Sequence, residues 1–212
     1  MENLKTKIKN FNQSFQKESN EYYRLKILDD DLPELKKILD VNFANVFPVA
    51  LEKFYCQFGG IKTDFYSPES FSINIPSLKT LMASLNQEGK YYKLVSIGII
   101  DQIMFSWGND RWEFDDEISV ENRHFLNENY KCFGWYRYDS GLEAANYLYF
   151  DKKGKFGEIL YNQYYFEELR DDILRPMLSE SPATEDLEDM LSRIIDKLES
   201  GIDEREEIEN DD

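Results

Sequence analysis

The segment that most constrains the fold is residues 47–61, which have the pattern of a helix with two marked ends. Pro48 suits a first helical turn, because its missing N–H would have no partner there. Large apolar residues recur at spacings of three and four over residues 51–58, which predicts one apolar stripe. Gly59 can adopt the left-handed conformation that ends a helix without a Cβ clash, and Gly60 follows it. The segment therefore predicts a buried helix that stops at a glycine pair.

Helical spacing also dominates the N-terminal part of the chain. Residues 1–30 are polar but carry apolar residues on one face and predict a helical extension. Residues 32–43 predict a second helical unit, and residues 76–89 predict a further helix that begins at a proline.

The C-terminal part predicts two more helices, over residues 165–178 and 181–200. Ser181 is the expected N-cap of the second helix, with Pro182 at its first position. Gly201 is expected to end that helix, and the acidic residues beyond it are expected to be disordered.

The middle of the chain has the texture of short strands. Asp151 to Lys155 forms a five-residue loop that contains Gly154, which fits a hairpin. Turn signals separate the other candidates. The predicted strands are residues 71–75, 92–99, 102–107, 111–114, 131–138, 145–150 and 156–161.

The chain has a formal net charge of −17, from 42 acidic and 25 basic residues. Seven acids and one arginine in residues 201–212 contribute −6 of it, so the rest of the chain is acidic as well. A protein that binds nucleic acid needs a basic surface to hold the phosphates, so this acidic chain is not expected to bind nucleic acid directly. A basic protein partner is favoured, because opposite fields speed encounter. Solubility alone is the alternative explanation of the charge.

Motifs for catalysis, a metal ion or a cofactor are mostly absent from the sequence. His124 is the single histidine and stands in a polar context that predicts an exposed side chain, so a His-rich metal site cannot be built. Phosphate-binding loops and nucleophile elbows are absent from the sequence. Cys56 and Cys132 predict structural thiols in a reducing compartment, with Cys56 near the buried side of its helix. We expect a protein that is not an enzyme and takes no cofactor.

Acidic and aromatic residues are dense between residues 107 and 165. Paired acids could serve glycoside hydrolysis or hold Ca²⁺, although the twelve-residue calcium loop is missing. Exposed Tyr and Trp beside acids are typical of interface hot spots, whereas a solvated edge with most aromatics in the core is the alternative. The predicted partner contacts are Asp110, Trp112, Asp115, Asp116, Glu117, Tyr136 and Asp139.

The sequence also predicts where the protein works. The first residues have no apolar run behind their charges, which argues against a signal peptide. Apolar stretches of the ~18 residues needed for a membrane span are absent from the sequence. We expect a cytoplasmic protein without a membrane partner.

Three segments follow one another in an order that resembles a known family. The first segment, residues 47–60, combines a proline, an amphipathic helix and a glycine pair. The second, residues 94–98, predicts a strand leading into an Ile-Gly turn. The third, residues 147–154, predicts a strand and an Asp-x-x-Gly hairpin. This order resembles the SUKH superfamily, which includes Smi/Knr-type fungal cell-wall assembly regulators and bacterial toxin-immunity proteins. Phe58 stands where that family usually has Asn, and residues 99–101 stand where it usually has a Gly-Asp pair. The turn residues concerned are Gly59, Gly60, Gly98, Asp151 and Gly154.

The resemblance implies an α+β fold, with a central, mainly antiparallel or mixed sheet of about five to six strands flanked by N-terminal and C-terminal helices. It divides the chain into an N-terminal extension (1–30), a SUKH-like domain (31–200) and an acidic tail (201–212). It also implies a binding role without catalysis.

The first functional hypothesis is an immunity protein that neutralises a cognate toxin domain, for which a basic nuclease is a candidate. The alternatives are a regulatory scaffold that binds a cellular signalling or cell-wall-assembly protein, and, more remotely, a carboxylate-based hydrolase. The identity of the partner and the oligomeric state stay open.

Overall fold

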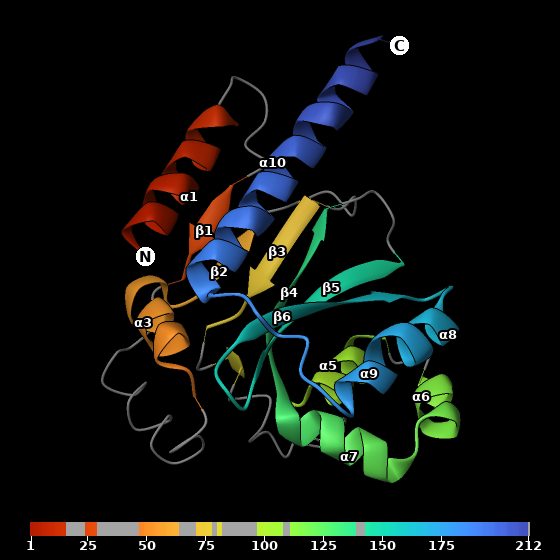
Figure 1. Ribbon diagram of the computed structural model, residues 1–212. Coiled ribbons are helices and arrows are strands. Elements are labelled where there is room, and N and C mark those ends of the chain that lie inside the picture. The colour runs from red at the N-terminus through yellow and green to blue at the C-terminus, as the bar shows by residue number, and fades with distance from the viewer. Residues whose placement is uncertain are drawn as a thin grey trace.

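The computed structural model contains one antiparallel six-stranded sheet in which the strands follow sequence order, β1-β2-β3-β4-β5-β6 (Figure 1). The structure describes residues 1–15, 24–28, 47–63, 71–77, 80–81, 97–107, 111–138 and 143–211. Each strand pairs antiparallel with the next, which gives the expected α+β architecture. The strands are β1 (Leu25–Ile27), β2 (Ile61–Thr63), β3 (Phe71–Ile75), β4 (Tyr130–Tyr138), β5 (Ala144–Asp151) and β6 (Phe156–Asn162).

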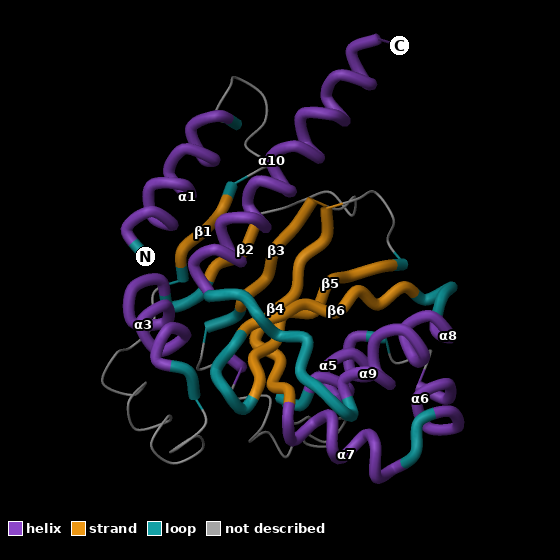
Figure 2. The backbone as a smooth tube through the Cα atoms, viewed as in Figure 1, coloured by secondary structure: helices purple, strands orange, loops and turns teal. Residues whose placement is uncertain are grey.

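Helices cover both faces of this sheet (Figure 2). The first group packs on β1 to β4 and consists of α1 (Glu2–Ser14), α3 (Val49–Phe58) and α10 (Leu187–Asp211). The second group consists of α5 (Ile99–Ser106), α6 (Arg111–Glu117), α7 (Val120–Asn129), α8 (Phe166–Glu168), the π-helical turn η2 (Leu169–Leu174) and α9 (Arg175–Met177). The hydrophobic core is therefore split into two layers by the sheet.

The alternation of β5 separates the two layers of the core. Leu148 and Phe150 are buried on the side of α1, α3 and α10, whereas Tyr147 and Tyr149 are buried on the side of α5 to α9. Successive side chains of a strand point to opposite faces, and both faces are covered, so nearly every residue of β5 is buried. This explains why the segment has a continuous run of large apolar and aromatic residues.

The predicted glycine turn after α3 is confirmed. Gly59 is left-handed, with φ of 59°, and its N–H donates to the carbonyl of Tyr55 at 2.8 Å. Gly60 has φ of 140°, and a Cβ there would lie 2.6 Å from the carbonyl oxygen of Ile75. Both positions therefore need glycine, the first for its conformation and the second for the close approach of β3 as well.

The predicted β5–β6 hairpin is also confirmed. Oδ1 of Asp151 accepts hydrogen bonds from the backbone N–H groups of Lys153 (2.8 Å) and Lys155 (3.0 Å). Gly154 has φ of 74°, which a side chain disfavours. Asp151 is 4% exposed, so its carboxylate fixes the turn from inside.

Several strand predictions in the middle of the chain are wrong. The segments 102–107 and 111–114 lie in helices α5 and α6, and Gly98 is the N-cap of α5 instead of a turn between strands. The buried face of α5 consists of Ile99, Ile100, Ile103 and Met104. In so short an apolar run, periodicity does not distinguish a helix from a strand. In the N-terminal extension, residues 25–27 form strand β1 instead of a helix.

The predicted limits of the last helix are wrong at both ends. Residues 181–186 precede the helix, because Glu185 forms a bridge with Phe156 and Ser181 bonds Asp151. Helix α10 continues through Gly201 to Asp211, so the acidic segment is helical here. A Cβ at Gly201 would lie 2.3 Å from Cε1 of Phe71, which shows that this glycine admits a close helix–sheet contact.

Some predictions fall outside the described residues. These are the helical unit at 32–43, all but a few residues of the helix at 76–89, and the start of the strand at 92–99. Cys56 is described and is exposed, so its prediction as a residue near the buried side is wrong.

Candidate protein-binding surface

Four of the predicted contact residues lie together on helix α6: Trp112, Asp115, Asp116 and Glu117. Asp110 and Asp139 lie outside the described residues. Tyr136 lies elsewhere and is treated below. The structure therefore brings part of the predicted set onto a single short helix.

Helix α6 is anchored by one buried aromatic residue. Phe114 is completely buried, and its ring lies 4.9 Å from that of Phe166 and 5.7 Å from that of Tyr161, measured between centroids. Ile118, the residue after the helix, is also buried and belongs to the same core layer. This anchoring leaves Trp112 on the outside, with 61% of its surface exposed.

The carboxylates of α6 differ in their partners. Asp115 forms an ion pair with Arg123 of α7, and Glu117 forms one with Arg170 of η2. Asp116 is exposed, and within the described part of the chain it has no ion pair. Asp116 therefore presents its full charge to solvent, whereas its two neighbours hold α6 against the adjacent helices.

The segment before α8 extends this surface with two more aromatic residues. Tyr164 and Tyr165 are 73% and 55% exposed, and Glu167 and Glu168 behind them are exposed as well. The Phe114–Phe166 contact and the Glu117–Arg170 ion pair place this segment beside α6. We call the combined surface the acidic-aromatic face, which consists of Trp112, Asp115, Asp116, Glu117, Tyr164, Tyr165, Glu167 and Glu168.

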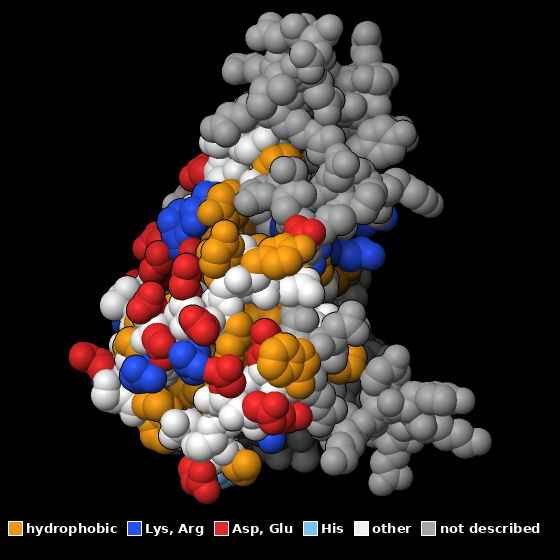
Figure 3. All heavy atoms as spheres, turned by 90° about the vertical axis from the view of Figure 1, so that its right-hand side faces the viewer, with side chains coloured by type: hydrophobic (Ala, Val, Ile, Leu, Met, Phe, Trp, Pro, Cys, Tyr) orange, Lys and Arg blue, Asp and Glu red, His pale blue; other side chains and the backbone are white. Residues whose placement is uncertain are grey.

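The view onto this side of the molecule shows hydrophobic and acidic side chains intermingled (Figure 3). Two arginines border the face and are engaged by its acids: Arg123 pairs with Asp115, and Arg170 pairs with Glu117 and also with Asp171, 3.0 Å away. The hydrogen bond from Arg170 is the main reason that the pKa of Asp171 is lowered. The face therefore keeps a net negative charge around exposed rings.

Tyr136 is not a surface residue, and its prediction as a contact is wrong. Its exposed fraction is 0%, and it lies in the core layer beneath α10. Its hydroxyl donates to Glu158 at 2.9 Å and accepts from Lys197 at 3.1 Å. Burial, followed by the negative charge of Glu158, raises the pKa of Tyr136. The residue links β4, β6 and α10, so its role is structural.

Within the described part of the chain, the remaining reactive side chains do not converge on one centre. His124 lies on α7 with its side chain 72% exposed, as predicted, 3.3 Å from Glu128. Cys132 is buried, and burial raises the pKa of its thiol to about 12. Among the described residues, groups of three or more His, Cys, Asp and Glu that could hold a metal ion are not found.

Tyr164 and Tyr165 were missed as contact residues by the sequence reasoning. They belong to the aromatic-rich region, in which composition alone does not separate exposed rings from core rings. The available signal was their place close to Glu167 and Glu168, because charged side chains are seldom buried and mark a segment that reaches the surface.

The part of the chain that the structure describes contains no helix long and apolar enough to cross a bilayer. Comparisons of this chain with models of protein families, with curated proteins and with solved structures find no match.

Proposed function

We propose that this protein is a non-enzymatic binding module whose acidic-aromatic face binds a basic protein domain. The observation that carries the proposal is the set of exposed rings of Trp112, Tyr164 and Tyr165 among carboxylates. Tryptophan and tyrosine dominate the binding energy of protein interfaces, and a ring with most of its surface in water gains by being covered.

The proposed partner is a toxin domain, and the proposed role is that of an immunity protein acting in the cytoplasm. The net charge of −17 supports a basic partner, because complementary fields raise association rates. A basic nuclease is the partner chemistry we favour, since nucleases need positive surfaces to hold phosphates. The resemblance to the SUKH superfamily points in the same direction.

The partner is best sought by purification from the native host with the tagged protein, read by mass spectrometry at low and moderate salt. Recovery of a large secreted protein with a basic toxic domain supports the immunity role. Recovery of signalling or cell-envelope proteins supports the scaffold alternative, and a partner that is neither would contradict both.

Once the partner is identified, the contact surface is tested by two single variants. Asp116→Lys should slow association about three- to tenfold at low salt, because the charge steers encounter. Trp112→Ala should weaken the equilibrium affinity by about 2 kcal/mol, mainly through faster dissociation. Both side chains are exposed, so neither change should alter folding.

The matched control is Glu52→Lys on α3, an exposed acid at the far side of the molecule from α6 (Figure 1). It changes the net charge by the same amount as Asp116→Lys. Equal slowing by both variants would assign the effect to total charge and would contradict a contact on α6.

A further inference from the structure

A pocket of about 400 Å³ opens between β6, the η2–α9 segment and the chain leading into α10. It shares no residue with the acidic-aromatic face. Its walls include Phe156, Ile173, Pro176 and Pro182, which offer an apolar channel for an extended chain.

Tyr149 of β5 forms part of the pocket wall. Tyr149 is 1% exposed, and its ring packs edge-on against Tyr130 with centroids 5.4 Å apart. Within the described residues the Tyr149 hydroxyl has no hydrogen bond. The hydroxyl is not fully enclosed, so a molecule in the pocket can reach it and form a hydrogen bond with it.

Gly157 keeps this hydroxyl accessible. A Cβ at position 157 would lie 2.5 Å from Oη of Tyr149, and both residues line the pocket. A side chain there would fill the space over the hydroxyl. Burial raises the pKa of Tyr149, so the phenol stays protonated and can both donate and accept a hydrogen bond.

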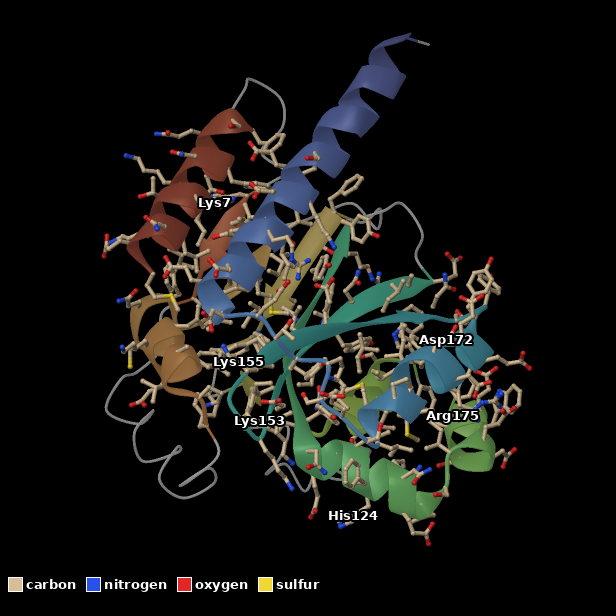
Figure 4. The ribbon with its side chains drawn as sticks, in the orientation of Figure 1. Lys7, His124, Lys153, Lys155, Asp172 and Arg175 are labelled. Atoms are coloured by element: carbon tan, nitrogen blue, oxygen red, sulfur yellow. The ribbon has the colours of Figure 1, made fainter. Side chains whose placement is uncertain are left out.

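The charged groups of the pocket favour a cation. Three carboxylates line it, from Glu158, Asp172 and Glu185, against the single guanidinium of Arg193. Arg193 is already bonded to Glu158 (3.2 Å) and Glu185 (2.8 Å). Asp172 has no ion pair within the described residues, and it lies on the η2 segment beside β6 (Figure 4). An incoming cation would therefore find Asp172 available, whereas Glu158 and Glu185 are already paired with basic side chains.

We propose that this pocket binds an aliphatic chain that ends in a guanidinium or ammonium group, the chemistry of an arginine or lysine side chain. The apolar walls hold the methylene groups, Asp172 pairs with the charged end, and Tyr149 accepts a hydrogen bond from it. The proposal stands apart from the proposed function, because its test needs no protein partner.

The test is a titration of the full chain, followed by NMR, with three probes. These are agmatine, the peptide acetyl-Gly-Arg-Gly-amide, and the same peptide with citrulline, a neutral isostere of arginine. The arginine peptide should bind at least tenfold more tightly than the citrulline peptide, with shifts centred on the Gly157 amide. If agmatine binds as tightly as the arginine peptide, the ligand is a free cation. If agmatine binds clearly more weakly than the arginine peptide, the ligand is an arginine within a polypeptide chain. Equal binding of the two peptides, or absence of binding by either cation at several millimolar, would overturn the proposal.

Two variants and a control locate the site. Asp172→Asn and Tyr149→Phe should each weaken binding of the cationic probe, the first by about tenfold and the second by less. Glu168→Gln removes an exposed carboxylate from the neighbouring helix α8 and should leave binding unchanged. Asp172 is exposed, so loss of fold is not expected for its variant. Unchanged binding in Asp172→Asn would contradict the assignment.

Discussion

The hydroxyl of Ser181 donates a 2.6 Å hydrogen bond to Oδ2 of Asp151, thirty residues earlier in the chain. The other oxygen of Asp151 closes the β5–β6 hairpin through two backbone N–H groups. One buried carboxylate therefore fixes a tight turn and, at the same time, the segment that leads into α10. Next to it, Glu185 and Phe156 exchange backbone hydrogen bonds of 3.1 and 3.2 Å. The two contacts together hold the segment before α10 against the β5–β6 hairpin.

Replacing Asp151 by alanine should cost about 2–4 kcal/mol of unfolding free energy, because a buried acceptor of three hydrogen bonds is lost. Ser181→Ala should cost only about 1 kcal/mol, since it removes one of the three. Urea unfolding followed by far-UV circular dichroism measures both. A loss in Asp151→Ala no larger than that in Ser181→Ala would show that the turn bonds contribute little.

Gly201→Ala should destabilise the protein although alanine is the better helix former. The gain in helix propensity is about 1 kcal/mol. The new Cβ would lie 2.3 Å from Cε1 of Phe71 and 2.9 Å from the carbonyl oxygen of Tyr138, and the second atom belongs to the backbone and cannot move freely. We expect a net loss of about 1–3 kcal/mol, as for other overpacked sites.

The neighbouring Ser200→Ala variant is the control for helix propensity, because Ser200 is exposed on the same helix. It should be neutral or slightly stabilising. If Gly201→Ala were stabilised to the same extent, α10 would not approach β3 as closely as described.

These examples show which parts of the fold the sequence can predict. Gly59, Gly60 and the Asp151 hairpin were predicted because local backbone chemistry decides such turns. Gly201 has the same local signature as a helix end, but the reason for that glycine is a contact with Phe71, 130 residues away in the chain. A contact that distant leaves no trace in the neighbouring sequence.

The same limit applies to the helices of the middle region and to the candidate surface. Segments such as residues 99–106 and 111–117 are too short for periodicity to separate strand from helix, and their partners in the core decide. The acids of α6 were predicted as surface residues because charge is seldom buried. Tyr136 was assigned wrongly because tyrosine occurs both in the core and at the surface. In this protein Glu158 and Lys197 form hydrogen bonds with its hydroxyl in the interior.

Tyr136→Phe tests that reassignment. The variant leaves Glu158 without one hydrogen bond and removes an acceptor for Lys197, so it should cost about 1–1.5 kcal/mol of stability. Because the side chain is fully buried, the affinity for a partner that binds the acidic-aromatic face should not change. A variant with native stability but weakened partner binding would reverse the assignment.

The two cysteines should differ sharply in reactivity toward a thiol reagent at pH 8. Cys56 is exposed, so it should react within minutes, although desolvation and then the charge of Glu52 raise its pKa. Cys132 is buried and has a pKa of about 12, so it should react only when the protein unfolds. Titration of native protein should therefore count one thiol, and titration in urea should count two.

The Cys132 thiol should also make the free energy of unfolding depend on pH under alkaline conditions. The folded state holds the proton of Cys132 up to about pH 12, whereas the unfolded thiol has a pKa of 9.0. The stabilisation is fully present below pH 9.0 and is lost as pH rises toward 12, because only the unfolded state releases the proton in that window. Cys132→Ala should flatten this part of the curve, and Cys56→Ala is the control that should leave it unchanged. A decline equally steep in Cys132→Ala and in the parent protein would assign the alkaline loss to other groups.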